Sequence, residues 1–527
     1  QKLQIWSCRK AICMIHNPIL RGFCPDPSII RVGEDYYIAT STFEWWPGVK
    51  LWHSKDLENW EQLPSPLNRI SQLNMLGDPT SGGVWAPDIT YDGERFWLVF
   101  TDVKTKKGRY YNNHNYVVWA EDIRGPWSDP VYLNSTGFDP SMLHDSDGRK
   151  YVVNMRNGFK GVLVQEYDPV QQRLIGEVQN VFPGSGIGFT EGPHIYHIGG
   201  WYYCLVAEGG TGYGHCVTIA RSKSIWGPYE VDPGNPMLTS DADNPEMLQK
   251  CGHADLVNTQ NGEWYLVHLC ARPPKGQKLC QLGRETGIQK VYWNEEGWLR
   301  LSCGGRVGQN ETESPSGIAP HPMETPRERD EFDSADMPVR YSFPRLPLQE
   351  NLSLTERPGW LRLYGQESLN SLHHVSLAAV RQTEYNACAE TCLEFSSACP
   401  EQFAGLAYMY DAANFYLFGK SRSDEGHDVL TVVKSDWHTV TDETAPVPLP
   451  PHKRLWLRIT ADADTARCLY SVDGESWTDM GVLLLTELVT DEHCRGFTGA
   501  HFGMYCHDMT GKRQYADFDY FYCSCSP

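Results

Sequence analysis

The sequence predicts an all-β protein in which a five-bladed β-propeller is followed by a β-sandwich domain. Helical periodicity is weak along the chain, which argues against a helical or α/β fold. The N-terminal part contains a repeated strand motif, and the C-terminal part alternates apolar and polar residues in short segments separated by turns. A chain of 527 residues is also too long for one ordinary core, so at least two domains are expected.

The repeated motif occurs five times and marks the predicted blades. Its central residues, at positions 27, 87, 140, 193 and 254, are 60, 53, 53 and 61 residues apart. A polar turn and an aromatic-rich strand follow each copy, and a second hairpin follows the first. Five such four-stranded units arranged radially form a propeller, with the motif as the innermost strand of each blade. The copies are residues 26–29, 86–89, 139–142, 192–195 and 253–256.

Composition along the chain predicts the domain boundaries. Residues 1–16 are expected to be an N-terminal extension outside the fold, because their short apolar stretch does not match a signal peptide. Residues 17–304 form the predicted propeller. The segment 305–330 is rich in Gly, Ser, Pro and Glu and predicts a linker. Residues 331–527 form the predicted β-sandwich, of jelly-roll or concanavalin-like type.

Charge and cysteine content narrow the classes of partner. The chain has 46 Lys and Arg against 66 Asp and Glu, a net charge of −20, which disfavours binding to nucleic acid or to an anionic membrane. It has no apolar run long enough to span a bilayer. Its 17 cysteines lack zinc-type spacing and predict free thiols in a reducing cytoplasm. A cytoplasmic location is therefore expected, with secretion as the open alternative.

Three carboxylates from three different blades are the candidate catalytic residues. Asp26 and Asp139 occupy the same column of the aligned repeats, and Glu191 directly precedes the fourth copy. Carboxylates on buried inner strands are costly, and neighbouring ones raise one another's pKa. Glycoside hydrolysis requires such a set, with one carboxylate ionised and another protonated. Taken singly, an Asp-Pro pair is also a common turn opener, so a structural role stays open for each aspartate.

These residues lie in segments that resemble glycoside hydrolase family 43, specifically its two-domain β-xylosidases and α-L-arabinofuranosidases. The resemblance covers about residues 16–523. The matching motifs include Pro25-Asp26-Pro27-Ser28, Trp85-Ala86-Pro87-Asp88, Phe138-Asp139-Pro140-Ser141, Thr190-Glu191-Gly192-Pro193-His194, Cys251-Gly252-His253-Ala254 and Leu282-Gly283-Arg284-Glu285-Thr286.

The resemblance implies a role for each candidate residue. Asp26 is similar to the general base that activates water, and Glu191 to the general acid. Asp139 is similar to the third carboxylate, which sets the pKa of the acid and orients it. Arg284 is similar to an arginine whose planar fork reaches the sugar and the catalytic carboxylates. The further residues with an implied substrate-binding role are Phe43, Trp85, His253 and Phe497.

The family also implies inversion, with the two working carboxyl groups roughly 6.5–9.5 Å apart. A sandwich loop carrying Phe497 would close the pocket around one terminal sugar, which implies exo action. No cofactor is required by the resemblance, and a calcium ion near His253 is the weaker alternative, because calcium prefers oxygen ligands. A homotetramer is implied by analogy. His501, where relatives carry Phe, and a short segment at 269–282 put the leaving-group preference in doubt.

The expected function is release of xylose from the non-reducing end of β-1,4-xylooligosaccharides with inversion, and with α-L-arabinofuranosidase side activity. The first alternative is an enzyme that is primarily an α-L-arabinofuranosidase. The second is a non-catalytic carbohydrate-binding propeller, which should lack one of the three carboxylates. The third is a retaining fructan-type enzyme, which would carry Asp-Pro-Asn where this chain has Asp26-Pro27-Ser28.

Overall fold

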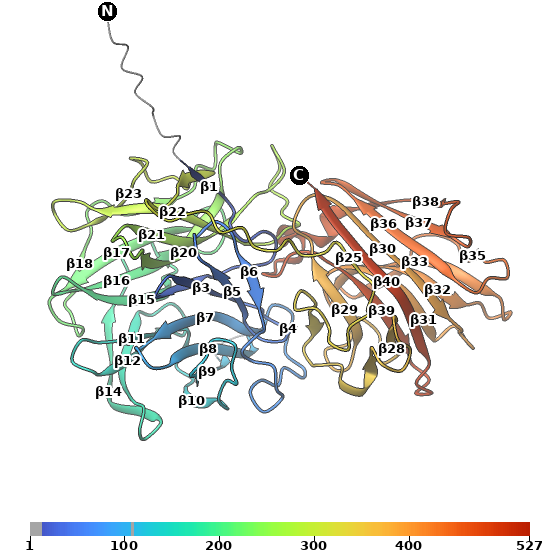
Figure 1. The fold of residues 1–527 in the computed structure, drawn as a ribbon, viewed down its shortest axis with the longest axis horizontal. Coiled ribbons are helices and arrows are strands. Elements are labelled where there is room, and N and C mark those ends of the chain that lie inside the picture. Colours follow the sequence, from blue (N-terminus) through green and yellow to red (C-terminus); the bar gives the residue numbers. More distant parts are fainter. Residues whose placement is uncertain (1–12, 107–109, 527) are drawn as a thin grey trace, which may run out of the picture.

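The computed structural model describes residues 13–106 and 110–526, and these are almost entirely β-structure. Two domains lie side by side, with the N-terminal domain in blue to yellow and the C-terminal domain in yellow to red (Figure 1). The helices of the described residues are each a single turn: η1 (Gln349–Asn351), η2 (Thr486–Val489) and α1 (Asp491–Cys494). Among the described residues, no helix is long and apolar enough to cross a membrane.

The N-terminal domain is a propeller of five antiparallel sheets, which confirms the predicted fold. Each sheet begins with its innermost strand and continues outward along the chain. The blades are β2 (Ser28–Val32), β3 (Asp35–Thr40), β5 (Lys50–Ser54) and β6 (Glu61–Leu63); β7 (Gly83–Tyr91), β8 (Phe96–Thr105), β9 (Asn112–Ala120) and β10 (Val131–Asn134); β11 (Gly137–His144), β12 (Lys150–Arg156), β13 (Val162–Asp168) and β14 (Arg173–Phe182); β15 (Glu191–Ile198), β16 (Trp201–Glu208), β17 (Cys216–Ser222) and β18 (Glu230–Val231), with β19 (Leu238–Thr239) beside β17; and β20 (Gln249–Asn258), β21 (Trp264–Ala271), β22 (Glu285–Trp293) and β23 (Leu299–Leu301).

The start of every innermost strand has the same unusual backbone. The first residues of the five repeats all have positive φ: 52° at Asp26, 27° at Ala86, 52° at Asp139, 56° at Gly192 and 43° at His253. In four blades the strand pairing also shifts register across this residue. A bulge of this kind re-aims side chains at the end of a sheet. The repeat alignment made from the sequence is therefore confirmed, and the five residues lie at one end of the ring of innermost strands, here called the mouth.

The ends of the propeller chain are held together by hydrogen bonds. Strand β1 (Met14–His16) pairs antiparallel with β24 (Glu311–Glu313). Asn17 follows β1, and its side-chain nitrogen Nδ2 donates to the carbonyl oxygens of Ile288 and Gln309, at 2.8 and 2.9 Å. Its side-chain oxygen accepts from the Ile288 backbone nitrogen at 2.8 Å. The segment before the first blade is thus tied to the last blade.

Two expected boundaries are corrected by this pairing. The extension expected over residues 1–16 includes β1, whose backbone groups are satisfied by β24, so residues 14–16 belong to the fold. Residues 1–12 lie outside the described residues. The linker expected over residues 305–330 contains β24 and ends in β25 (Arg329–Asp330), which pairs with a strand of the sandwich. Low-complexity composition therefore does not make this segment free of the two domains.

The C-terminal domain is a sandwich of two antiparallel sheets, as predicted. Apolar residues from both sheets form a shared core between them, including Leu406, Phe418 and Leu457, which are fully buried. One sheet contains β25, β27 (Leu352–Ser353), β28 (Leu361–Tyr364), β40 (Tyr515–Ser526), β30 (Asn386–Phe395), β36 (Leu455–Ala461), β37 (Thr465–Ser471) and β38 (Thr478–Leu485). The other contains β29 (Ser376–Arg381), β39 (His501–Asp508), β31 (Gln402–Asp411), β32 (Asn414–Arg422), β33 (Asp428–Asp436), β34 (Thr439–Asp442) and β35 (Val447–Pro448).

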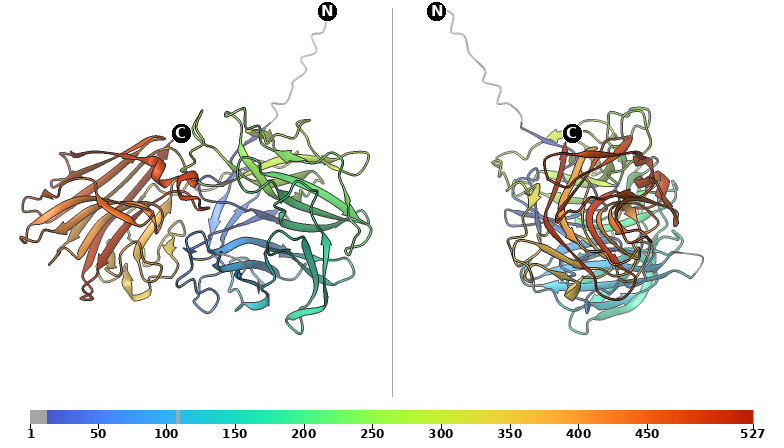
Figure 2. Two further views of the ribbon diagram at one scale, coloured as in Figure 1. Left: turned by 180° about the vertical axis from the view of Figure 1, so that it is seen from behind. Right: turned by 90° about the vertical axis from the view of Figure 1, so that its right-hand side faces the viewer.

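The sandwich contacts one side of the propeller (Figure 2). Strand β26 (Phe343–Pro344) pairs with β4 (Trp45–Trp46) of the first blade region. The Trp45 ring stacks on His501 of the sandwich, with ring centres 4.1 Å apart. The backbone nitrogen of Phe497 donates to Ser81 Oγ at 3.0 Å. These contacts place the loop before β39 beside the mouth.

We predict that Asn17→Ala destabilises the propeller. The substitution removes three side-chain hydrogen bonds that tie the segment before the first blade to Ile288 of the last blade and to Gln309 after it. Each is worth about 1 kcal/mol, so the free energy of unfolding should fall by about 2–3 kcal/mol. Denaturant unfolding of the full chain measures the change. Asn68→Ala, at an exposed asparagine, is the matched control. Equal stability of the two variants would show that these bonds do not hold the ring closed.

Candidate active site

The three predicted carboxylates gather at the mouth from three blades. Asp26 and Asp139 hold the left-handed positions before β2 and within β11, and Glu191 is the first residue of β15. Asp139 Oδ2 accepts a hydrogen bond from the Gly192 backbone nitrogen at 3.0 Å, so it lies against the start of β15. Asp26 and Asp139 are buried, whereas the Glu191 side chain keeps 16% of its surface exposed. Glu191 is thus the member of the group most open to an incoming ligand.

Asp26 is held in its ionised form. Burial by itself would raise its pKa, but the opposing effects of Arg284, His253 and the Ser41 hydroxyl are larger together, and the pKa lies below its usual value. Ser41 Oγ donates to Asp26 Oδ2 at 2.6 Å, and Arg284 Nη1 donates to Oδ1 at 3.2 Å. An ionised, hydrogen-bonded carboxylate of this kind can accept a proton from water.

The pKa of Asp139 is shifted in the opposite direction to that of Asp26. Burial, followed by the charges of Glu191 and Asp26, raises the pKa of Asp139 well above its usual value. The hydrogen bond donated by the Gly192 backbone and the charge of Arg284 oppose this rise, but they are smaller. A proton therefore stays within this group of carboxylates at a pH where Asp26 is ionised. That division of charge is what acid and base catalysis by two carboxyl groups requires.

Two histidines flank the carboxylates. His253 Nδ1 lies 3.8 Å from Asp26 Oδ1, and burial lowers the pKa of His253 to about 4, so its ring is neutral. Its ring also packs against Gly192, where a Cβ atom would come within 2.9 Å of it. His215 lies on the other side, with Nε2 3.6 Å from Glu191 Oε1 and Nδ1 3.0 Å from the Lys250 carbonyl oxygen. The Lys250 carbonyl oxygen accepts from Nδ1, so Nε2 is the ring nitrogen that faces Glu191.

Arg284 joins the carboxylates to the second domain. Besides Asp26, it donates to Thr211 Oγ1 at 2.9 Å and to the Phe497 carbonyl oxygen at 3.4 Å. Its guanidinium carbon lies 4.9 Å from the centre of the Phe497 ring. Arg284 Nε is buried without a hydrogen-bond partner among the described residues. The structure therefore brings Arg284 into the site, as predicted.

Aromatic side chains surround the same group. The Phe497 ring lies 5.5 Å from Phe43 and 6.0 Å from Trp85, with Trp85 5.7 Å from Phe138 on the third blade. Phe43 and Phe497 also contact Arg284, and His253 lies beside Asp26, so the four residues predicted to bind substrate gather in this part of the structure. His501, the departure noted in the sequence, is fully buried behind this wall and stacks on Trp45.

Comparisons with known proteins agree with this geometry. Residues 15–299 match the family described as Glycosyl hydrolases family 43, and residues 329–524 match the Beta xylosidase C-terminal Concanavalin A-like domain. The Xylosidase/arabinosidase 43B of Humicola insolens is 44% identical, over 96% of this chain and 97% of its own. The Beta-xylosidase of Bacillus subtilis (strain 168) is 44% identical, over 96% of this chain and 99% of its own. The chain belongs to glycosyl hydrolase family 43.

Solved structures support the same assignment. The crystal structure of xylan beta-1,4-xylosidase from Bacillus halodurans C-125 superimposes with a TM-score of 0.94 at 46% identity, covering 97% of this chain and 100% of that one. The structure described as Bacteroides ovatus Xyloglucan PUL GH43B gives a TM-score of 0.90 at 35% identity, with 98% and 100% coverage. The protein is therefore a glycosidase of family 43 with both domains of its full-length relatives.

Sequence reasoning missed several residues of this family 43 site. Ser41, which binds Asp26, lies two residues before Phe43 in a segment that the family resemblance already included. Thr211 and His215 belong to the loop between β16 and β17, where no motif marks them. Their side chains reach the site only because the fourth blade places that loop beside β20. Contacts made by a loop in this way have no local sequence pattern.

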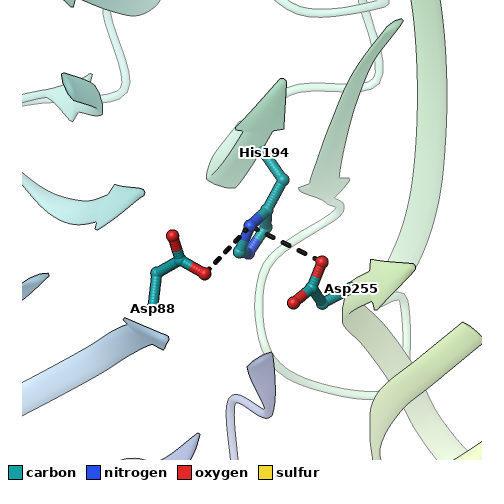
Figure 3. Close-up of side chains that lie close together, drawn as sticks. All are labelled: Asp88, His194 and Asp255. Atoms are coloured by element: carbon teal, nitrogen blue, oxygen red, sulfur yellow. Dashed lines mark ion pairs between the residues drawn. The ribbon is translucent and has the colours of Figure 1, made fainter. Parts of the chain in front are cut away.

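A second group of polar residues lies deeper in the ring of innermost strands (Figure 3). Asp88 of β7, His194 of β15 and Asp255 of β20 are buried, and one ligand atom of each lies within 4.8 Å of the others. Their positions are two residues after the mouth residues of the same blades. The group could hold a metal ion, and it does not include His253. Calcium near His253 therefore stays an expectation that this group does not test.

We predict that Ser41→Ala shifts the acid limb of the pH–activity profile to higher pH. The Ser41 hydroxyl stabilises ionised Asp26, so its removal raises the pKa of Asp26, and the base becomes ionised only at higher pH. The expected shift in kcat/KM is up to about one pH unit. Ser41→Thr, which keeps a hydroxyl, is the control. An unchanged acid limb in the alanine variant would separate Ser41 from the ionisation of the base.

Proposed function

We propose that the protein is an exo-acting β-xylosidase that releases xylose from the non-reducing end of β-1,4-xylooligosaccharides with inversion. The observation that carries the proposal is that three carboxyl groups meet at the mouth, where the pKa of Asp26 is lowered and that of Asp139 is raised. Relatives named xylosidases, similar over nearly their whole length, support the choice of sugar.

In the proposed reaction, Asp26 removes a proton from water, which attacks the anomeric carbon from one face of the ring. Glu191 donates a proton to the leaving oxygen on the other face, and Asp139, whose own pKa is raised, lies beside Glu191. His215 Nε2 and the Gly192 backbone position Glu191 and Asp139. Arg284 keeps Asp26 ionised through its hydrogen bond to Oδ1. This chemistry uses the chain's own carboxylates throughout.

Exo action follows from the position of the sandwich loop. Phe497 covers Arg284 and contacts Phe43 and Trp85, so an aromatic wall from the second domain stands over the mouth. A closed end of this kind admits one terminal sugar and leaves the rest of the chain outside. A propeller without such a wall would leave an open groove suited to internal cleavage.

A second candidate activity is that of an α-L-arabinofuranosidase. The Humicola insolens relative is named a xylosidase/arabinosidase, and a Bacteroides ovatus relative named a non-reducing end alpha-L-arabinofuranosidase is 36% identical over 99% of this chain. The two sugars can present similar hydroxyl groups to the same carboxylates. Comparing kcat/KM for the 4-nitrophenyl β-xyloside and the α-arabinofuranoside ranks the two activities, and a higher value for the arabinofuranoside would reverse the proposed order.

We predict that the two catalytic variants respond differently to the leaving group. Asp26→Ala should lower kcat by about 10²–10⁴-fold for both xylobiose and 4-nitrophenyl β-xyloside, because both need an activated water. Glu191→Ala should lower kcat strongly for xylobiose but much less for the nitrophenyl substrate, whose leaving group departs without protonation. NMR of the first-formed sugar should show α-xylose. Initial β-xylose, or the reverse leaving-group pattern, would contradict the assigned roles.

A further inference from the structure

We propose that Asp88, His194 and Asp255 bind one divalent cation that joins three blades below the mouth. The residues come from β7, β15 and β20, the innermost strands of the second, fourth and fifth blades. Their side chains point toward a common centre (Figure 3). Among the described residues, none of the three forms a hydrogen bond or ion pair with Asp26, Asp139 or Glu191, so the site is distinct from the group of three carboxylates at the mouth.

The spacing of the three side chains suits a cation. His194 Nδ1 lies 3.7 Å from Asp88 Oδ1 and 3.8 Å from Asp255 Oδ1. Both separations are too long for hydrogen bonds. A metal with bonds of about 2.1–2.4 Å holds neighbouring ligand atoms about 3–4 Å apart. The gaps are therefore those expected around an ion.

The hydrogen bonds of the group leave its centre unsatisfied. His194 is only 7% exposed, and its ring makes no hydrogen bond among the described residues. Its Nδ1 therefore faces the two carboxylates without a direct partner. Asp88 Oδ2 accepts from the Met142 backbone nitrogen, but Oδ1 faces His194. Neither aspartate pairs with Lys or Arg in the described structure. Two buried carboxylates without a cation are costly, and one divalent ion would neutralise both.

The ligand set also indicates the class of ion. Calcium prefers a shell of oxygen atoms, whereas an imidazole nitrogen with two carboxylates suits zinc or manganese. Asp255 is already oriented by three donors: the Tyr196 hydroxyl at 2.5 Å, the Ile29 nitrogen at 2.6 Å and the Leu256 nitrogen at 2.7 Å. Such outer hydrogen bonds hold a ligating carboxylate in place. Zn²⁺ or Mn²⁺ is therefore expected ahead of Ca²⁺.

Metal content and thermal stability test this site in the full-length protein. After treatment with a chelator and removal of the chelator, the protein is titrated separately with Zn²⁺, Mn²⁺ and Ca²⁺. We expect one tightly bound Zn²⁺ or Mn²⁺ per chain by elemental analysis and a rise in Tm of about 3 °C or more, since the ion binds only the folded ring. Ca²⁺ should give a smaller rise.

Two amide variants decide whether the ion lies at these residues. Asp88→Asn and Asp255→Asn should both lose the stoichiometric ion and the metal-dependent rise in Tm. Asp243→Asn, an exposed aspartate of the same charge, should keep both. If Asp88 and Asp255 instead share a proton, the wild type will bind no ion and Asp88→Asn will be as stable as the wild type; either result overturns the proposal, as does an ion retained by both variants.

A different observation concerns the sandwich surface near the mouth. We infer that a cavity of about 520 Å³ there binds the part of a xylooligosaccharide that lies on the leaving-group side of the cleaved bond. This inference rests on the proposed function. The volume is within the range of small-ligand sites. The residues that line it are Leu279, Trp437, Glu487, Glu492, His493 and Arg495.

Trp437 is exposed on a strained turn. Asp436 of β33 pairs with Thr439 of β34, so the hairpin has a two-residue loop, in which Trp437 and His438 have φ of 49° and 66°. Asn-Gly is the usual sequence of such a turn, because positive φ disfavours bulky side chains. Trp437 is also 51% exposed. A large aromatic ring kept in this backbone and open to solvent is typical of a ligand contact.

The cavity is close to the catalytic residues. Arg495 precedes Phe497 by two residues, which places their Cα atoms at most about 7 Å apart. Glu492 is fixed against the propeller by the Tyr213 hydroxyl at 3.2 Å and the Cys280 nitrogen at 2.7 Å. Arg495 is exposed and has no hydrogen bond or ion pair among the described residues. The Trp437 face and the Arg495 donors can therefore bind a sugar ring that extends out of the site.

Chain-length dependence tests the outer site. We expect Trp437→Ala to lower kcat/KM about tenfold for xylotetraose and to leave 4-nitrophenyl β-xyloside within twofold of the wild type, because only the longer chain reaches Trp437. Trp437→Phe should restore part of the loss. Val440→Ala, at an exposed residue of the same hairpin, is the control.

The outcomes separate this site from the proposed function. An equal loss on both substrates, or no loss on either, would overturn the outer site. A wild type inactive on every xyloside would refute the proposed function instead. Calorimetric binding of xylotetraose to Glu191→Gln, with and without Trp437→Ala, then decides whether the cavity binds sugar, and equal affinities would exclude it.

Discussion

The left-handed backbone at the first position of each repeat is the constraint on which the site depends. Residues other than glycine avoid positive φ. Four non-glycine residues at the mouth nevertheless adopt it: Asp26, Ala86, Asp139 and His253. A single hairpin could not enforce this geometry, because the cost would be relieved by a small change in the turn. Five blades closed into a ring fix each strand from both sides, so the strained residues persist. The same constraint turns carboxylates from distant parts of the chain toward one mouth.

Equivalent positions in the ring do not give equivalent chemistry. Asp26 and Asp139 share a column and a backbone conformation, but their pKa values move in opposite directions. The difference comes from side chains outside the repeat: Arg284 lies beside Asp26, and Glu191 lies beside Asp139. Arg284 in turn donates to the Phe497 carbonyl oxygen of the sandwich. The second domain thus contacts the arginine that keeps Asp26 ionised.

Much of this arrangement was predictable because the repeats carry their own register. Aligning five motifs placed Asp26 and Asp139 in one column without any knowledge of contacts, and the common positive φ bears this out. Pairing between distant segments was not predictable in the same way. Strand β1 has three residues, too few to show alternation, and its partner β24 lies in a segment whose composition resembles a linker. His215 likewise reaches Glu191 from a loop, where no periodicity marks which side chain turns inward.

A layer of polar residues below the mouth links the innermost strands that carry the three carboxylates. Two residues further along each innermost strand, Ser28 and Ser141 form hydrogen bonds to neighbouring blades through their hydroxyl groups. The other three blades carry Asp88, His194 and Asp255 at this position. Blades one and three are joined to their neighbours through these hydroxyl groups. Asp88 and Asp255 also accept from neighbouring blades, at Met142 and Ile29, while their Oδ1 atoms face His194. The carboxylates at the mouth repel one another, which lowers the stability of the ring. Links between blades directly beneath the mouth stabilise the same innermost strands and so offset part of this cost.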